Sequence, residues 1–387
     1  MLRNLAPLDG CVERLHRAGG SGPLHGIRLA VKDNIEVAGA LFSAGHPLFR
    51  DRRGAATAPA VAALLAAGAS LSAMTATDAG GFGVTTAGVL NPRYPERVVG
   101  GSSGGSAAMV AAGRVDLGLG TDTGGSVRIP AACTRLWGMK LRHGAVSASG
   151  MWPMAAGLDS FGFIAAKPEI ISRAVCLLLP APALRRVPTR RIAYVDGAGW
   201  RRDRVTSHVF AAAIAALPDL GVEAVRVALP ERARLGECHA IQVLTEAQDV
   251  YREITDHDQL APATARALRA ALQITDAQRQ VATAQIDALN AQFEALSGEF
   301  DALLSPTLPV LPPKIGQRRV RLDNLPVLSA LTAETCLANL TGRAAICAPV
   351  GPVSLQLTGL AMSEHALSSH GADLLCGLAA HPLIQNT

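Results

Sequence analysis

Two segments rich in glycine and serine, residues 100–106 and 120–126, constrain the fold of this chain more than any other feature of its sequence. They read Gly-Gly-Ser-Ser-Gly-Gly-Ser and Gly-Thr-Asp-Thr-Gly-Gly-Ser. The first leads into a helix of small residues at 107–112. The second ends a strand candidate at 115–120, and a further helical stretch starts at Pro130. Glycine turns between strands and helices indicate a core in which backbones pack closely.

Apolar strand candidates alternate with helical patterns along the rest of the chain. The strands are expected at 27–31, 69–74, 191–195, 222–227, 302–305 and 353–357. The helices are expected at 57–67, 205–217, 240–254, 263–296 and 365–380. This alternation predicts an α/β layered fold with a mixed or mostly parallel sheet. The pattern changes after Pro180, and we interpret residues 188–300 as an insertion of helices and strands that forms a substrate-side lobe.

Composition excludes several classes of protein. The chain has 387 residues, of which 49% are hydrophobic and 17% charged, so it is not disordered and is long enough for one large domain over 1–387. Its basic residues are mostly arginines in short clusters, which favours a solvated surface over a nucleic-acid site. No run approaches the roughly 20 apolar residues of a membrane span. The seven cysteines are widely spaced without a Cys-x-x-Cys pair, which predicts free thiols in the cytoplasm and no metal site.

The glycine-serine segments have several interpretations when each is taken alone. A phosphate-binding loop needs a Gly-Lys pair, which is absent, and the segment 118–123 has threonine where a dinucleotide fingerprint needs its third glycine. Residues 101–105 formally match the nucleophile elbow of α/β-hydrolases, with His365 as a downstream partner. Each segment is also compatible with a plain tight turn.

Taken together, the two segments favour nucleophilic catalysis by serine. A serine nucleophile needs a base that takes its proton and donors that stabilise an oxyanion. The backbone N–H groups of Thr123, Gly124, Gly125 and Ser126 are candidates for these donors. A lysine can be the base if burial keeps it uncharged. The chain has four lysines, and Lys32, at the end of an apolar strand, is the best placed of them.

At this point the sequence resembles the amidase signature family. The resemblance rests on the segments 100–106 and 120–132 and on Val-Lys-Asp-Asn at 31–34. It covers residues 24–165, the expected signature core, and returns weakly at 301–309 and 339–342. It implies an amidase-signature-like fold, with a mixed β-sheet core covered by helices on both faces.

The resemblance also implies roles for individual residues. Ser126 resembles the nucleophile, Ser102 the bridging serine that follows a cis peptide bond, and Lys32 the general base. Ser103, Asp122 and Arg128 resemble supporting residues. For Arg128 the alternative is that it binds a substrate carboxylate.

The implied activity is hydrolysis of the C–N bond of a small carboxylic or urea-type amide through an acyl-serine, releasing ammonia or an amine, with no cofactor. Two alternatives stay open: a glutamine-dependent amidotransferase subunit, and a non-catalytic binding protein on the same scaffold. The expected partner is a small amide, without nucleic acid or membrane. The charged helix faces at 266–299 leave room for a homodimer. The chain departs from the family at 74–81 and in the short turn at 351–355, which touch the expected substrate walls.

Overall fold

The computed structural model describes residues 9–181, 190–254 and 259–387. These residues form one 11-stranded mixed sheet in the order β1-β3-β2-β4-β6-β5-β10-β11-β9-β7-β8. Its strands are β1 (Cys11–Arg17), β2 (Arg28–Lys32), β3 (Ser70–Thr75), β4 (Leu117–Asp122), β5 (Trp137–Lys140), β6 (Ser160–Ala165), β7 (Arg191–Tyr194), β8 (Glu223–Arg226), β9 (Ala302–Pro306), β10 (Ala345–Val350) and β11 (Val353–Gly359). The two halves of the chain therefore lie on opposite sides of the β5–β10 pairing.

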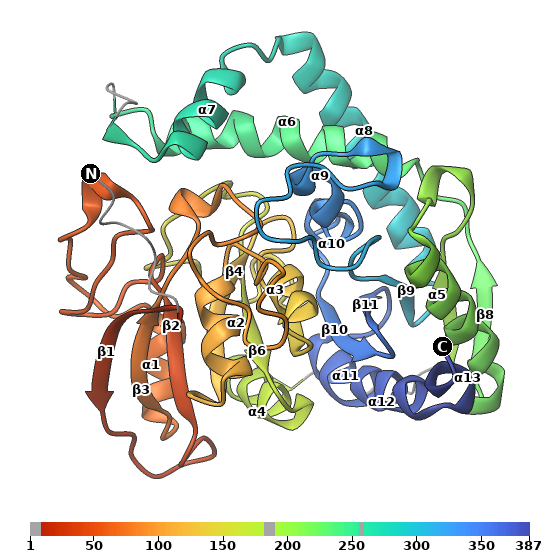
Figure 1. The fold of residues 1–387 in the computed structure, drawn as a ribbon, viewed down its shortest axis with the longest axis horizontal. Coiled ribbons are helices and arrows are strands. Elements are labelled where there is room, and N and C mark those ends of the chain that lie inside the picture. The colour runs from red at the N-terminus through yellow and green to blue at the C-terminus, as the bar shows by residue number, and fades with distance from the viewer. Residues whose placement is uncertain (1–8, 182–189, 255–258) are drawn as a thin grey trace.

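Helices cover this sheet (Figure 1). They are α1 (Pro59–Ala66), α2 (Gly104–Ala111), α3 (Arg128–Cys133), α4 (Pro168–Leu178), α5 (Arg204–Ala216), α6 (Arg232–Val250), α7 (Pro262–Ala271), α8 (Asp276–Ser297), α9 (Val327–Thr332), α10 (Cys336–Leu340), α11 (Glu364–Ala366), α12 (Ala372–Ala380) and α13 (Pro382–Gln385). Within the described ranges, every helix is too short or too polar to cross a bilayer.

The alternation of side chains along β2 explains how the sheet places a lysine in the site. Leu29 and Val31 point into the large core shared with α1, α4, α5 and α12, whereas Ala30 points into a small core with α2 and α3. Because side chains alternate between the faces of a strand, Lys32 lies on the same face as Ala30. The sheet therefore directs Lys32 toward the helices that follow the two glycine-serine segments. The prediction of an α/β fold with helices on both faces of a mixed sheet is confirmed.

Two expectations need revision. The single helix predicted at 263–296 is wrong, because a capping box at Thr275 and Gln278 starts a new helix there and separates α7 from α8. The lobe expected at 188–300 is divided, and residues 188–189 lie outside the described part. Strands β7 and β8 belong to the main sheet, where β7 pairs with β9. Only α6–α8 stand apart as a helical lobe, which spans the top of Figure 1.

Candidate active site

Lys32 and Ser102 meet in the protein interior. The Lys32 Nζ lies 2.8 Å from Ser102 Oγ and 2.8 Å from Thr121 Oγ1. The side-chain amide of Asn34 also donates to Thr121 Oγ1, at 3.0 Å. Lys32 is fully buried and Ser102 is 1% exposed, so solvent does not compete for these contacts. The structure thus joins the expected base to the expected bridging serine.

Ser126 lies beside this pair and nearer to solvent. The backbone N–H of Ser103 donates to the Ser126 carbonyl at 3.0 Å, which joins the two glycine-serine segments directly. The peptide bond between Gly101 and Ser102 is cis. Ser126 is 7% exposed, the largest value among Lys32, Ser102 and Ser126, and its hydroxyl has no hydrogen-bond partner among the described residues. The structure therefore contains a hydrogen bond between the side chains of Lys32 and Ser102 and none between those of Ser102 and Ser126.

The four backbone N–H groups expected to be oxyanion donors, those of residues 123–126, differ in their hydrogen bonding. The Gly125 N–H does not fit that expectation, because it already donates to Asp122 Oδ1 at 2.8 Å. The N–H groups of Thr123, Gly124 and Ser126 have no acceptor within residues 9–181, 190–254 and 259–387. Gly125 has a φ of +126°, and a Cβ added there would lie 2.2 Å from Thr335 Oγ1. The turn therefore requires glycine at this position.

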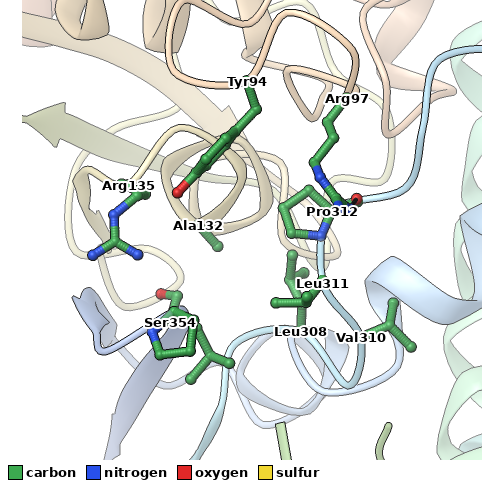
Figure 2. A pocket seen from close by; sticks show the side chains of 11 residues that line it. Tyr94, Arg97, Ala132, Arg135, Leu308, Val310, Leu311, Pro312 and Ser354 are labelled. Carbon is green, nitrogen blue, oxygen red and sulfur yellow. Dashed lines mark hydrogen bonds between the residues drawn. The ribbon is translucent and has the colours of Figure 1, made fainter. Parts of the chain in front are cut away.

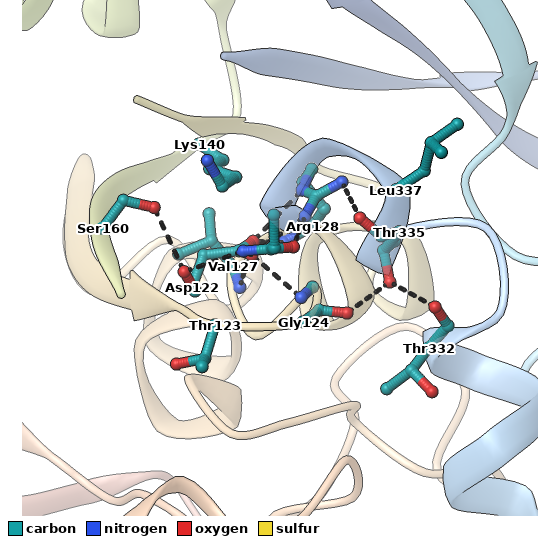
Figure 3. A network of polar contacts seen from close by, with 12 residues as sticks. Asp122, Thr123, Gly124, Val127, Arg128, Lys140, Ser160, Thr332, Thr335 and Leu337 are labelled. Carbon is teal, nitrogen blue, oxygen red and sulfur yellow. Dashed lines mark hydrogen bonds and ion pairs between the residues drawn. The ribbon is translucent and has the colours of Figure 1, made fainter. Parts of the chain in front are cut away.

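Asp122 and Arg128, which lie on either side of Ser126 in the sequence, form a fully buried ion pair (Figure 3). The Arg128 guanidinium donates to both Asp122 oxygens, at 2.9 and 3.1 Å. Its remaining donors reach the Thr335 carbonyl, Gln356 and Asn339 at distances of 2.8, 3.1 and 2.7 Å. Every N–H of the guanidinium has a protein acceptor. This geometry favours a structural role for Arg128 over the alternative that it binds a substrate carboxylate.

Charge balance explains how Asp122 stays ionised in this setting. Burial alone would raise the pKa of Asp122, but the Arg128 guanidinium and hydrogen bonds hold it well below its usual range. The carboxylate also accepts from the Val127 N–H at 3.2 Å and from the Asn339 side chain at 3.0 Å. Asp122 therefore anchors the turn that carries Ser126.

Burial also tunes Lys32. It lowers the pKa of the Lys32 amine to about 8, and the nearby carboxylates of Asp78, Asp159 and Asp122 oppose that shift. A lysine with this pKa is uncharged in a large fraction of molecules at mildly alkaline pH, as a general base must be. Burial likewise raises the pKa of Asp159 to about 6, against hydrogen bonds that favour the charged form.

Several residues of the site were missed by sequence reasoning. Asp159 accepts from Thr123 Oγ1 at 2.5 Å and so holds the side chain of the first residue in the turn. Asp78 accepts from Thr86 at 3.0 Å, and Thr86 in turn contacts the backbone around Ser102. Asp78 lies in the segment 74–81, where the chain departs from the family, and Asp159 lies within the range 24–165 that the resemblance covers. Thr121 lies inside the segment 120–132 that carries the resemblance, whereas His239, Thr335 and Gln356 lie outside every segment that carried a signal.

Figure 2 shows a pocket in the described part of the molecule. Its lining comes from the loop before α2, the end of α3 and the residues after it, the proline-rich stretch after β9, and the turn into β11: Tyr94, Arg97, Ala132, Arg135, Leu308, Val310, Leu311, Pro312, Pro352, Val353 and Ser354. None of Lys32, Ser102 and Ser126 belongs to it. In the part of the chain that the structure describes, no group of three His, Cys, Asp or Glu side chains is arranged to hold a metal ion.

Comparison with known proteins relates this geometry to a family. Residues 6–367 match the family model described as Amidase. The chain is 32% identical to a glutamyl-tRNA(Gln) amidotransferase subunit from Halobacterium salinarum over 412 aligned positions, covering 92% of this chain and 96% of that relative. A crystal structure of an amidase superposes with a TM-score of 0.84 at 29% identity, covering 92% of this chain and 86% of that one.

The plant matches are shorter. The chain is 42% identical to Amidase 1 of Oryza sativa subsp. japonica over 167 residues, which cover 41% of this chain and 38% of that relative. This alignment therefore spans well under two thirds of the plant protein.

Proposed function

The chain belongs to the amidase signature family, and we propose that it hydrolyses the C–N bond of a small carboxylic or urea-type amide. The main support for this proposal is the 2.8 Å contact between Lys32 Nζ and Ser102 Oγ in a buried site beside Ser126. An amine and a hydroxyl in that contact form the inner half of a proton relay, and Ser126 supplies the outer hydroxyl.

The relay starts with Lys32 uncharged. Its lone pair accepts a hydrogen bond from the Ser102 hydroxyl, and its N–H donates to Thr121 Oγ1. The Ser126 hydroxyl rotates toward Ser102 when a substrate amide fills the site. As Ser126 Oγ attacks the carbonyl carbon, its proton passes to Ser102 and the Ser102 proton passes to Lys32. Lys32 is then a cation, and the new C–O bond leaves a negative charge on the former carbonyl oxygen.

Backbone donors stabilise that oxyanion. The N–H groups of Thr123, Gly124 and Ser126, which have no acceptor among the described residues, are the donors that we assign to it. Donors fixed in advance stabilise a transition state strongly, because they need no reorganisation when charge develops. The Asp122–Arg128 pair and Asp159 hold the turn that carries these donors.

The intermediate then collapses with proton balance restored. The C–N bond breaks, and the Lys32 proton returns through Ser102 to the leaving nitrogen, which departs as ammonia or an amine. Water attacks the acyl-serine through the same relay and releases the carboxylic acid. No metal, redox partner or cofactor takes part in any of these steps as we propose them.

The test measures ammonia release from a panel of primary amides and urea derivatives. The Ser126→Ala variant should lose all activity, and a fluorophosphonate probe should add its mass to Ser126 in the wild-type chain only. Ser106→Ala is the matched control, because Ser106 comes from the same glycine-serine segment but its hydroxyl contacts Thr75 at 2.7 Å, away from the relay. Wild-type rates in Ser126→Ala would refute the assignment, and an unlabelled Ser126 would favour a non-catalytic binding protein.

A second function is supported by the Halobacterium relative. That relative is an amidotransferase component, and the alignment covers nearly all of both chains. An amidotransferase component would use the same relay to release ammonia from glutamine for a partner. It would co-purify with that partner from its native host and show glutaminase activity, whereas a chain purified alone with broad amidase activity would contradict this function.

The state of the cysteines is relevant to the cellular compartment of the protein. All seven are free thiols, and five of them are buried. Free thiols persist in reducing compartments, so they support our proposal of a cytoplasmic protein.

A further inference from the structure

His239 reaches the catalytic turn from the helical lobe formed by α6–α8. Its side chain extends from α6, it is 9% exposed, and its Nε2 lies 3.0 Å from the backbone carbonyl oxygen of Thr123. A carbonyl oxygen only accepts hydrogen bonds, so Nε2 must carry the proton of this contact. Burial lowers the pKa of His239, which keeps the ring neutral, with Nε2–H as its one donor.

This hydrogen bond fixes a whole peptide unit. The peptide bond between Thr123 and Gly124 is planar and trans, so its C=O and its N–H point in opposite directions. Holding the Thr123 carbonyl toward His239 therefore holds the Gly124 N–H toward the other side. That N–H has no acceptor among the described residues. It is one of the three donors assigned above to the oxyanion.

The next peptide in the turn provides an internal comparison. The Gly124 carbonyl accepts from Thr335 Oγ1 at 2.6 Å, and the N–H of the same peptide, that of Gly125, donates to Asp122. The carbonyls of Thr123 and Gly124 are thus both held by side chains from distant segments. Of these two peptides, the one held by His239 leaves its N–H unpaired among the described residues.

Gly124 itself makes room for the imidazole. A Cβ added at Gly124 would lie 2.5 Å from His239 Cε1 and 2.7 Å from Nε2. Any side chain at this position would therefore push the ring off the peptide. The glycine and the histidine fit together as one unit.

We propose that His239 is a positioning residue for the oxyanion donors: it holds the Thr123–Gly124 peptide so that the Gly124 N–H faces the developing oxyanion. This inference rests on the proposed amide hydrolysis. Through His239, the helical lobe would then affect the chemical step directly. Without the Nε2–H donor of His239, the Thr123–Gly124 peptide is free to rotate. His239 touches neither substrate nor Ser126 in this role.

The experiment compares His239→Leu with His239→Gln. Leucine removes the donor, and kcat should fall roughly 10- to 100-fold with KM little changed, somewhat below the roughly 10²–10³ typical of deleting an oxyanion donor itself. Glutamine carries an N–H near the position of Nε2 and should restore most of kcat. A trifluoromethyl ketone analogue of the best substrate forms a tetrahedral adduct with an oxyanion, so its inhibition constant should rise by the same factor as kcat/KM falls.

A control from the same helix separates positioning from lobe docking. Glu246 Oε2 accepts from the Gly157 N–H at 2.7 Å, so it also joins α6 to the core without contacting the turn. Glu246→Ala should therefore keep kcat near the wild-type value. Unchanged kcat in His239→Leu, an equal loss in Glu246→Ala, or ketone inhibition that does not follow kcat/KM would overturn the inference while leaving the hydrolase intact.

The proposed function fails in a different way. A wild-type chain that hydrolyses no amide and takes no adduct at Ser126 removes that function and this inference together. If the wild-type chain is active and the His239 variants have the same kcat, only the inference about His239 is refuted. If His239→Leu does not fold, His239→Gln and His239→Asn still decide the matter, because asparagine is too short to place its N–H at the position of Nε2.

Discussion

Replacing Lys32 by methionine should abolish hydrolysis and yet stabilise the protein at neutral pH. Burial lowers the pKa of Lys32 from 10.5 to about 8. Because one pH unit corresponds to about 1.36 kcal/mol, the buried charge costs about 3 kcal/mol of folding free energy below pH 8. Methionine has no charge to bury. It forfeits the hydrogen bonds to Ser102 and Thr121, worth about 1 kcal/mol each, which leaves a net gain of about 1 kcal/mol at pH 7.

The sign of this difference should reverse with pH. Between about pH 8 and pH 10.5 the unfolded chain holds the Lys32 proton and the folded chain does not, so wild-type stability rises with pH through this window. The free-energy cost of burying the Lys32 charge is absent above the pKa of Lys32 in the unfolded chain. It is fully present below the pKa of Lys32 in the folded chain. At pH 10.5 only the lost hydrogen bonds remain, and Lys32→Met should be about 2 kcal/mol less stable than the wild type.

Urea unfolding followed by tryptophan fluorescence at about pH 7 and about pH 10.5 measures both values. Lys140→Met is the matched control, because Lys140 is also fully buried, its pKa is lowered by burial to about 7, and its Nζ donates to the Leu141 and Arg343 carbonyls. It should show a similar pH dependence of stability and keep hydrolytic activity. A stability difference between wild type and Lys32→Met that does not change with pH would refute the reasoning.

Three further predictions concern the same site. The value of kcat/KM should rise with pH and level off near pH 8 as Lys32 loses its proton, and a flat profile between about pH 6 and pH 9 would contradict this. Arg128→Leu leaves Asp122 buried without its partner and should destabilise the fold by about 3–5 kcal/mol in urea unfolding, where a loss under about 1 kcal/mol would count against the network. Gly125→Ala places a Cβ 2.2 Å from Thr335 Oγ1 and should lower kcat about 10²-fold in the ammonia assay, with full activity as the opposing result.

Much of the fold could be predicted from local patterns. The apolar run before Lys32 indicates β2, and Pro59 in the first turn with Gly68 just after the end indicates α1. Strand β1 escapes such reasoning because it is an edge strand, whose polar Glu13 and His16 need no buried face. The break between α7 and α8 depends on the cap at Thr275, which a continuous apolar pattern conceals.

The candidate site divides in the same way. Lys32, Ser102 and Asp122 lie in short segments whose residue types already suggest chemistry. His239, Thr335 and Gln356 are ordinary residues in distant helices and strands, and they meet the turn only after the sheet has formed. No spacing along the chain connects them to residues 122–128. The sequence therefore indicates the groups that can react and the neighbouring pair Asp122 and Arg128, but not the distant side chains that hold the turn.

The strand order of the sheet is also relevant to which parts of the site are available during translation. Translation delivers Lys32, Ser102 and Ser126 in the first third of the chain, and this third forms one side of the sheet. The side chains that form hydrogen bonds to the turn and to Arg128 are synthesised late. They are Thr335, Asn339 and Gln356. A prematurely terminated polypeptide therefore carries Lys32, Ser102 and Ser126 without the distant side chains that hold the turn and Arg128 in place.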